Sequence, residues 1–242
     1  MKVIRYQDAL YAEFVQILDR QAIPSSDIYE TVAAIVGAVK KDGNKAVYEY
    51  TQKFDKLTLT DETLYVSEAE LAEAEELVED SVKEAIAASK KNVQAFAHKS
   101  MRQDWKYTNA EGAEVGERFV PYDRVGVYVP GGKAPLVSTA LMTAAIGQAV
   151  GVENILAATP AGATGKVNPS LLYALKESGA TEIIKVGGAQ AIAAMALGTE
   201  TVKPVEKIFG PGNSFVVEAK RQLVGAVSID LLPGPSEVLI IA

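Results

Sequence analysis

Three glycine-rich segments carry the residues whose types and spacing could bind a ligand. They are Pro130-Gly131-Gly132-Lys133-Ala134-Pro135, Gly187-Gly188-Ala189-Gln190 and Gly210-Pro211-Gly212-Asn213. Glycines let a backbone turn tightly and approach a ligand closely, and a helix that starts after such a turn offers unpaired N–H groups to an anion such as a pyrophosphate. The amides of Gln190 and Asn213 both donate and accept hydrogen bonds, which suits ribose hydroxyls and carboxamides. We therefore expect a shared binding crevice that contains both amides.

The glycines alone do not identify a cofactor. None of the segments has the G-x-G-x-x-G pattern of dinucleotide-binding proteins or the P-loop pattern. The simpler alternative for Gln190 and Asn213 is that each only caps its helix, which is frequent for asparagine. A fourth turn, Pro233-Gly234-Pro235-Ser236-Glu237, places the Ser236 hydroxyl where it could reach a ligand or cap a turn, and composition does not decide between these.

Alternating strand-like and helical segments position these turns. From Val125 onward the strand-like runs are VGVYV, NILAAT, EIIKV, KIF, VSIDLL and EVLIIA, and helical segments follow each of the first four. Strands that alternate with helices of this kind are typical of right-handed βαβ units and a mainly parallel sheet, in which ligands bind beyond the carboxyl ends of the strands. The sequence predicts an α/β fold with a Rossmann-like, doubly wound core.

A mainly helical region precedes this core over roughly the first 100 residues, because apolar residues recur there at spacings of three and four. Ser67 and Glu70 fit a capping box, which predicts a helix from Glu68, and Asp80 is expected to cap the next helix. The apolar positions of these helices are Ile28, Val32, Ile35, Val36, Val39, Val82, Ile86, Val93 and Phe96. Two alternating stretches between Trp105 and Pro121 flank the turn residues 109–112, which predicts a hairpin.

Composition excludes several classes of function. The 24 basic and 31 acidic residues give a net charge of -7 without a basic block, so neither a nucleic acid nor an anionic membrane surface is an expected partner. The absence of cysteine excludes disulfides, thiolate zinc sites and a cysteine nucleophile. The N-terminus lacks a signal-peptide pattern, which favours a cytoplasmic protein. The apolar stretch 136–152 predicts a buried helix, and the acidic run 68–80 predicts a solvated helix face.

Four segments resemble histidinol dehydrogenases in order and approximate spacing: VGVYVPGGKAPLVSTALMTA, VGGAQAIAAMALGTE, KIFGPGNSFVVEAKRQ and IDLLPGPSEVLIIA. The resemblance extends to DGNKAVYEYTQKFD and VSEAELAEA, and so to essentially the whole chain. It implies a zinc-dependent homodimer that oxidises L-histidinol to L-histidine in two hydride transfers to NAD, through the aldehyde, in histidine biosynthesis. It also implies that Tyr128, Gln190 and Asn213 are NAD contacts and that Ser236 is a substrate contact.

The resemblance further implies a domain organisation. Residues 1–124 would form a helical region with the hairpin, as an incomplete first domain, residues 125–236 a Rossmann-like domain, and residues 237–242 the first strand returning to the first domain. The family's zinc ligands and catalytic Glu-His pair lie beyond the GPSE segment, so we expect no catalytic or metal-binding residue in this chain and little activity from it alone. His98, the single histidine, is expected to be a packing or surface residue. Apolar surface left exposed would favour homo-oligomerisation.

Three functions stay open from the sequence. The first is histidinol dehydrogenase, with NAD and a small-molecule substrate as partners. The second is an NAD-binding module, or half-enzyme, that needs a partner chain. The third is a paralogous dehydrogenase of another small alcohol, because fold and cofactor contacts do not fix the substrate.

Overall fold

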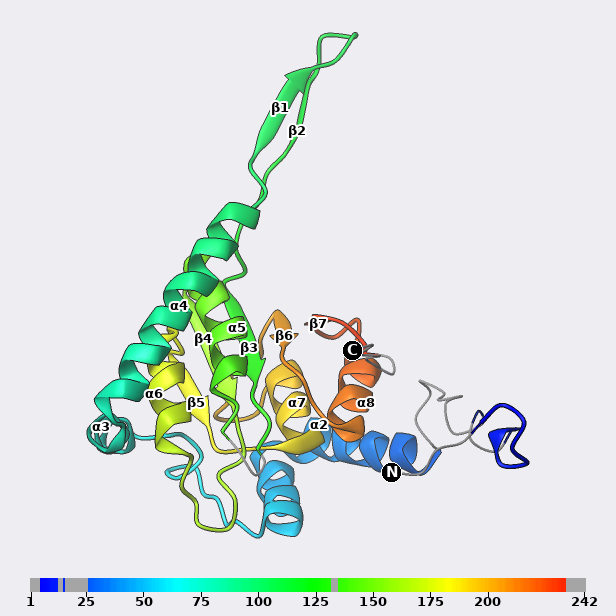
Figure 1. Cartoon of the computed structure of the whole chain (residues 1–242), viewed down its shortest axis with the longest axis vertical. Coiled ribbons are helices and arrows are strands. Elements are labelled where there is room, and N and C mark those ends of the chain that lie inside the picture. The colour runs from blue at the N-terminus through cyan, green and yellow to red at the C-terminus, as the bar shows by residue number, and fades with distance from the viewer. Residues whose placement is uncertain (1–4, 13–14, 16–25, 132–134, 234–242) are drawn as a thin grey trace.

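The structure is a computed structural model that describes residues 5–12, 15, 26–131 and 135–233 (Figure 1). Ser236 and the expected strand at residues 237–242 lie outside these described residues, as do residues 132–134 of the first glycine-rich segment. Within the described part, the prediction of an α/β fold is confirmed.

A five-stranded parallel sheet forms the centre of the molecule, in the order β5-β4-β3-β6-β7. The strands are β3 (Arg124–Tyr128), β4 (Asn154–Ala158), β5 (Glu182–Ile184), β6 (Lys207–Phe209) and β7 (Ser228–Ile229). Val125, in the central strand, is in register with Ile155 of β4 and with Lys207 of β6. The chain moves outward from β3 to β5, then crosses to β6 on the other side of β3, so the strand order reverses at β3. That reversal is the point at which ligands bind in doubly wound folds.

Helices cover both faces of the sheet, which explains why the strands read as continuous apolar runs. The four helices that follow strands are α5 (Val137–Ala149), α6 (Pro169–Glu177), α7 (Gly188–Leu197) and α8 (Ser214–Leu223). Figure 1 shows α5 and α6 on one side of the sheet and α7 and α8 on the other. The apolar core is divided accordingly, with Ile155 packed among α5 and α6 residues and Leu156, the next residue along, among α7 residues.

The predicted N-terminal helices form an outer layer over these two faces. The helix α2 (Ser26–Asp55) packs on α7 and α8, whereas α3 (Glu68–Leu77) packs on α6 and α4 (Asp80–Ser100) packs on α5. Gly43, with φ of 52°, interrupts the helical geometry of α2 and kinks it. The division into domains at residue 124 stays a prediction, since the core side chains of α2 join those of the sheet in one cluster.

The local helix signals were partly right. The capping box is confirmed, because Glu70 N donates to Ser67 Oγ at 3.2 Å and Ser67 N donates to Glu70 Oε2 at 2.9 Å. The prediction that Asp80 caps α4 is wrong: Glu79 is the N-cap residue and makes no side-chain cap bond. Asp80 is already the first helical residue, where its charge favours the helix dipole without accepting a capping bond. Phe96 is 74% exposed although its spacing predicted a core position.

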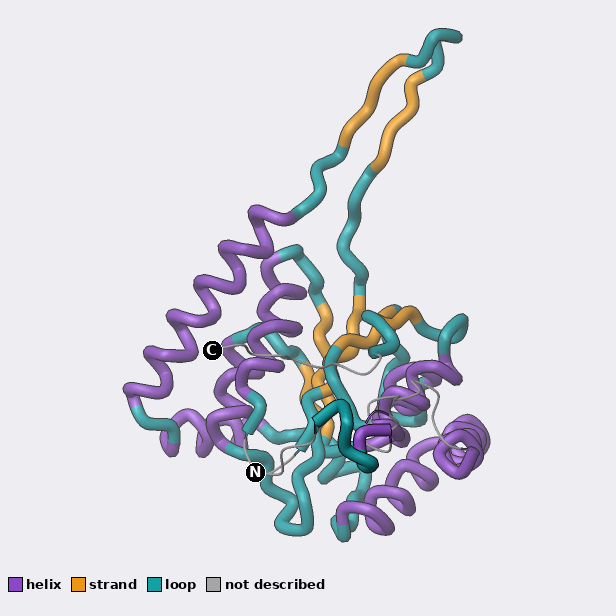
Figure 2. The backbone as a smooth tube through the Cα atoms, turned by 45° about the vertical axis from the view of Figure 1, so that its right-hand side comes forward, coloured by secondary structure: helices purple, strands orange, loops and turns teal. Residues whose placement is uncertain are grey.

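The predicted hairpin is present as β1 (Trp105–Thr108) and β2 (Glu114–Glu117), paired antiparallel. Asn109 Oδ1 accepts hydrogen bonds from the backbone N–H groups of Glu111 and Ala113 and so closes the turn. Both strands are exposed along their whole length, and they extend away from the body of the molecule (Figures 1 and 2).

Within the apolar stretch 136–152, α5 buries Ala140, Leu141, Ala144 and Ala145 but leaves Met142 and Ile146 exposed. In the part of the chain that the structure describes, no helix has the length and apolar character needed to cross a membrane.

Candidate functional site

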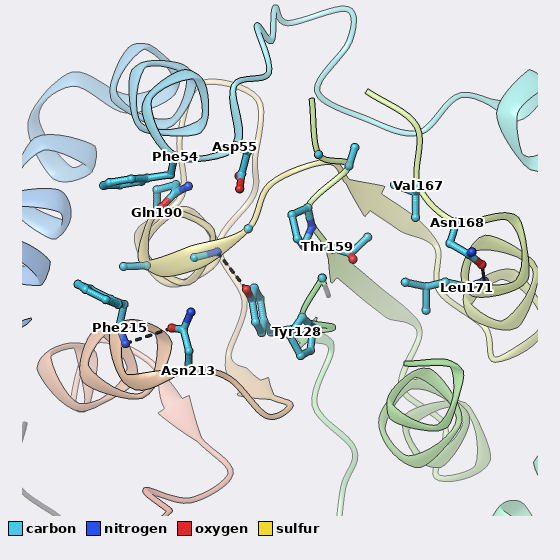
Figure 3. Close-up of a pocket in the computed structure, with 18 of the residues that line it drawn as sticks. Phe54, Asp55, Tyr128, Thr159, Val167, Asn168, Leu171, Gln190, Asn213 and Phe215 are labelled. Carbon is cyan, nitrogen blue, oxygen red and sulfur yellow. Dashed lines mark hydrogen bonds between the residues drawn. The ribbon is translucent and has the colours of Figure 1, made fainter. Parts of the chain in front are cut away.

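A cavity of about 800 Å³ lies at the carboxyl ends of β3, β4 and β5 and at the N-termini of α7 and α8 (Figure 3). We call it the crevice. Its volume lies in the range of small-molecule and cofactor sites. The crevice is located where the sequence predicts the glycine-rich turns to meet. Its side walls include Ile35, Phe54, Asp55, Tyr128, Thr159, Pro160, Lys166, Val167, Asn168, Leu171, Gln190, Asn213 and Phe215.

Glycines allow the turns of the crevice to approach one another. A Cβ on Gly131 or Gly187 would lie 2.5 or 2.8 Å from the side chain of Pro160, which follows β4. Gly210, with φ of 118°, passes so close to β3 that a Cβ there would lie 2.1 Å from the carbonyl oxygen of Tyr128. Because contacts this short require glycine, the turns after four successive strands are held together at one edge of the sheet.

Tyr128 stands at the centre of the crevice, at the end of β3 (Figure 3). Its hydroxyl oxygen accepts a hydrogen bond from Gly188 N at 3.0 Å, which ties β3 to the start of α7. Burial raises the pKa of Tyr128, and the negative charge of Asp55 adds to this effect. The phenol therefore stays protonated at neutral pH and keeps an O–H that can donate to a ligand.

Gln190 lies in the first turn of α7 and is only 1% exposed. The capping alternative does not hold for it, because the N-cap residue is Gly187 and α7 has no side-chain cap bond. Among the described residues, Gln190 Oε1 and the buried hydroxyl of Thr159 have no hydrogen-bond partner. A buried polar atom without a partner costs about 1–3 kcal/mol. Both residues line the crevice, so a polar ligand there can supply the hydrogen bonds that these two atoms lack.

Asn213 does cap its helix, as the simpler alternative predicted. Its Oδ1 accepts hydrogen bonds from Phe215 N at 3.1 Å and Val216 N at 3.2 Å at the start of α8 (Figure 3). Capping uses only the carbonyl oxygen, and the amide nitrogen takes no part in either bond. The cap also fixes the orientation of the side chain at the crevice wall, so capping and ligand binding are compatible.

An ion pair between the buried Lys220 and the partly exposed Asp230 holds the turn that carries Asn213. Lys220 Nζ donates to Asp230 Oδ1 at 2.7 Å and to the carbonyl oxygen of Gly210 at 2.6 Å. Asp230 Oδ2 accepts from Gly210 N at 2.9 Å, so both backbone polar groups of this glycine are engaged. Sequence reasoning missed Lys220 and Asp230. The available signal was a lysine on the apolar side of an amphipathic helix, which needs a buried partner.

The structure also brings to the crevice residues from outside the glycine-rich turns, which sequence reasoning missed. Phe54 and Asp55 come from the end of α2, and Phe215 comes from α8 (Figure 3). Burial raises the pKa of Asp55. Phe54 and Asp55 end the segment DGNKAVYEYTQKFD, which carries part of the family resemblance, but sequence reasoning assigned them no role in the site because the packing of α2 against α7 is what places them there.

The remaining candidates from the sequence lie elsewhere. A ring nitrogen of His98 lies 3.0 Å from the carbonyl oxygen of Ala149, which joins α4 to the end of α5, outside the crevice. The acidic run 68–80 is a solvated helix face, as expected, because all of its acidic residues except the partly buried Glu70 are exposed. Glu70, Glu73 and Glu75 also form ion pairs with lysines 185, 166 and 176. Among the described residues, no group of three or more His, Asp or Glu side chains could hold a metal ion.

Comparison with known proteins gives one consistent result. A protein-family model described as histidinol dehydrogenase matches residues 18–242. The histidinol dehydrogenase of Thermosynechococcus vestitus is 44% identical over 243 residues, which cover 100% of this chain and 56% of that protein. That of Caulobacter vibrioides is 42% identical over 229 residues, covering 95% of this chain and 53% of the relative. The crystal structure of histidinol dehydrogenase from Elizabethkingia anophelis superimposes with a TM-score of 0.84 at 37% identity, over 93% of this chain and 52% of that one. The chain thus spans about half the length of the curated relatives it matches.

Proposed function

This chain belongs to the histidinol dehydrogenase family, and from that premise we propose that its crevice binds NAD for the oxidation of L-histidinol to L-histidine, in the cytoplasmic biosynthesis of histidine. The observation that carries the proposal is the convergence of Tyr128, Gln190 and Asn213 on one cavity at the point where the strand order reverses.

The crevice suits a dinucleotide in its chemistry. Tyr128 offers a protonated hydroxyl, Gln190 a buried amide oxygen without a partner, and Asn213 an amide nitrogen. Phe54 and Phe215 add partly exposed aromatic rings on which a base can stack. When bound, NAD would supply the acceptor for the hydride that leaves the alcohol carbon. The residues of this chain would hold and orient it.

Zinc, which the family resemblance also implies, does not fit the described residues. They contain no cluster of metal-ligating side chains, and their one histidine is engaged between α4 and α5. We therefore assign no zinc ligand and derive no step through zinc from them. Ser236, outside the described residues, stays a proposed substrate contact. That the described residues contain no cluster of metal-ligating side chains favours a second candidate function, a half-enzyme that binds NAD but needs further residues for turnover.

A homo-oligomer is also part of the proposal. A second, largely apolar cavity of about 520 Å³ lies at the base of the hairpin, and its walls include Met101, Phe119, Pro121, Tyr122, Met142 and Ile146. We call it the hairpin-base groove. Several of these side chains are exposed together. Contiguous apolar surface of this kind is uncommon on monomers and is typical of an interface.

Calorimetric titration of the 242-residue chain with NAD tests the proposed function. Two variants remove the proposed contacts without adding charge: Gln190→Met keeps the size of a buried side chain, and Asn213→Ser keeps a neutral capping oxygen but removes the amide donor. Each should weaken NAD binding by about 10-fold, the value of one hydrogen bond of roughly 1.4 kcal/mol.

Asn92→Ala, at an exposed position of α4, is the matched control and should bind as the unmodified chain does. Absence of NAD binding by the unmodified chain would contradict the proposal. Zinc-dependent oxidation of histidinol by the same 242 residues would contradict the half-enzyme alternative.

A further inference from the structure

The crevice lacks a carboxylate at the position usual for dinucleotide-binding folds. There an acidic residue roughly 20 residues beyond the first glycine-rich turn binds the ribose 2′-hydroxyl. In this chain that interval leads to β4, which is followed by Thr159, Pro160 and Ala161. Glu153 precedes β4 and so lies at the opposite edge of the sheet. The sheet itself therefore provides no acid for the ribose.

The outer helical layer provides one instead. Asp55, the last residue of α2, is the one carboxylate among the described residues that line the crevice. Figure 3 shows its side chain on the same wall as Phe54 and Gln190, with Tyr128 across the cavity. It forms no hydrogen bond or ion pair with another side chain in the described part of the chain. Asp55 is partly buried, and this burial raises the pKa of its carboxyl group.

We propose that Asp55 accepts the hydrogen bonds of the adenosine ribose hydroxyls and thereby makes the crevice selective for NAD over NADP. The inference rests on the proposed function. A carboxylate can accept from both hydroxyls of a ribose, and hydrogen bonds to an ionised group are stronger than neutral ones. Phe54 precedes Asp55 in the same wall, is 48% exposed and offers a ring face to the adenine.

The charges of the crevice also disfavour the extra phosphate of NADP. No arginine is found among the described lining residues, and Lys166, the one lysine among them, pairs with Glu73 at 2.9 Å. A 2′-phosphate would replace the hydroxyl that Asp55 binds and would place like charges side by side. Repulsion between such charges at short distance disfavours binding.

Titration of the 242-residue chain with NAD and, separately, with NADP tests the inference. The Asp55→Asn variant keeps the shape of the side chain but removes its charge. It should weaken NAD binding by about 10-fold or more, as expected for a lost hydrogen bond to a charged group. NADP binding should be unchanged or stronger, so the NAD to NADP preference falls. Asp42→Asn, at an exposed position of the same helix, is the control and should change neither affinity.

Three outcomes decide between the proposals. If Asp55→Asn keeps both the NAD affinity and the preference, the inference is wrong while the proposed function stands. If neither the unmodified chain nor Asp42→Asn binds NAD, the proposed function fails and the inference fails with it. If Asp55 has a purely structural role, Asp55→Asn should lower the melting temperature of the ligand-free chain and weaken the binding of NAD and NADP equally. That result would also overturn the inference. We expect the melting temperature of ligand-free Asp55→Asn to be equal or higher, because the substitution removes a poorly solvated charge.

Discussion

The crevice and the hairpin region lie at opposite edges of one sheet and present different kinds of surface. In the crevice, polar side chains from several elements are buried and fixed: Tyr128 by Gly188 N, Asn213 by the start of α8, and Gly210 by Lys220 and Asp230. At the other edge, the hairpin and the hairpin-base groove expose apolar and aromatic side chains that pack on little else in the chain. Rigid polar groups suit a small polar ligand, and exposed apolar surface suits a protein surface. The comparison thus supports the two proposals, cofactor binding at one edge and association at the other.

The largest expected effect comes from the ion pair under the crevice. Lys220→Met removes the cation from a site where its side chain is 3% exposed, and leaves Asp230 and the Gly210 carbonyl without their partner. Because Lys220 is buried but Asp230 is partly exposed, loss of the lysine should lower the free energy of unfolding by about 1–3 kcal/mol, less than for a fully buried pair. Urea denaturation measures this value, and NAD binding should weaken as well because the Asn213 turn is released.

Lys176→Met is the matched control, since it breaks the exposed pair with Glu75. Exposed pairs contribute about 0–1 kcal/mol. Equal losses in the two variants would show that the crevice turn is not held by Lys220, and the contrast between a fixed crevice and a loosely packed opposite edge would lose its main support.

A smaller, pH-dependent effect should distinguish Asp55 from the other crevice residues. Its pKa in the folded chain lies above the usual 3.8, so the folded state binds protons more tightly than the unfolded state. The stability associated with this group is therefore present at pH values below 3.8 and lost as the pH rises through the folded pKa. Burial raises the pKa of Tyr128, which also lines the crevice, so its phenol stays protonated throughout the acidic range.

The ligand-free Asp55→Asn variant should consequently gain melting temperature relative to the unmodified chain as the pH is raised from about 3.5 to 6. Melting curves of both proteins across this range provide the measurement, with Asp42→Asn as the exposed comparison. A difference in melting temperature that stays constant across this pH range would mean that Asp55 is as well solvated as Asp42. The crevice would then hold no partly desolvated carboxylate at this position.

The sequence predicted the parts of this molecule that depend on local pattern. The βαβ alternation, the Ser67 capping box, the Asn109 turn and the glycine-rich turns all follow from residues near one another in the chain. What it could not predict depends on packing between distant elements. Asp55 reaches the crevice because α2 packs on α7, and Lys220 pairs with Asp230 where both bind the backbone of Gly210 after β6. The burial of Gln190 Oε1 and the Thr159 hydroxyl likewise becomes visible only in three dimensions.

The smallest effect on stability is expected in the hairpin. Trp105 and Tyr107 stack on one exposed face of β1, with ring centroids 6.1 Å apart, and are 48% and 57% exposed. Because they cover no core residue, Trp105→Ser should change the free energy of unfolding of the monomer by less than about 0.5 kcal/mol. An isolated two-stranded hairpin is marginally stable in water, so its side chains gain most if a second copy covers them.

Light scattering coupled to size-exclusion chromatography should then show a change that denaturation of the monomer does not. The unmodified chain should be a dimer. Trp105→Ser and Ile146→Glu, the latter in the hairpin-base groove, should each shift the dimer toward a monomer while NAD binding in the crevice stays as before. Lys91→Ser, on the exposed part of α4, serves as the control. A monomeric unmodified chain, or a dimer that both substitutions leave intact, would contradict the assignment of association to this edge. Loss of NAD binding in either variant would show that the two edges are coupled rather than separate.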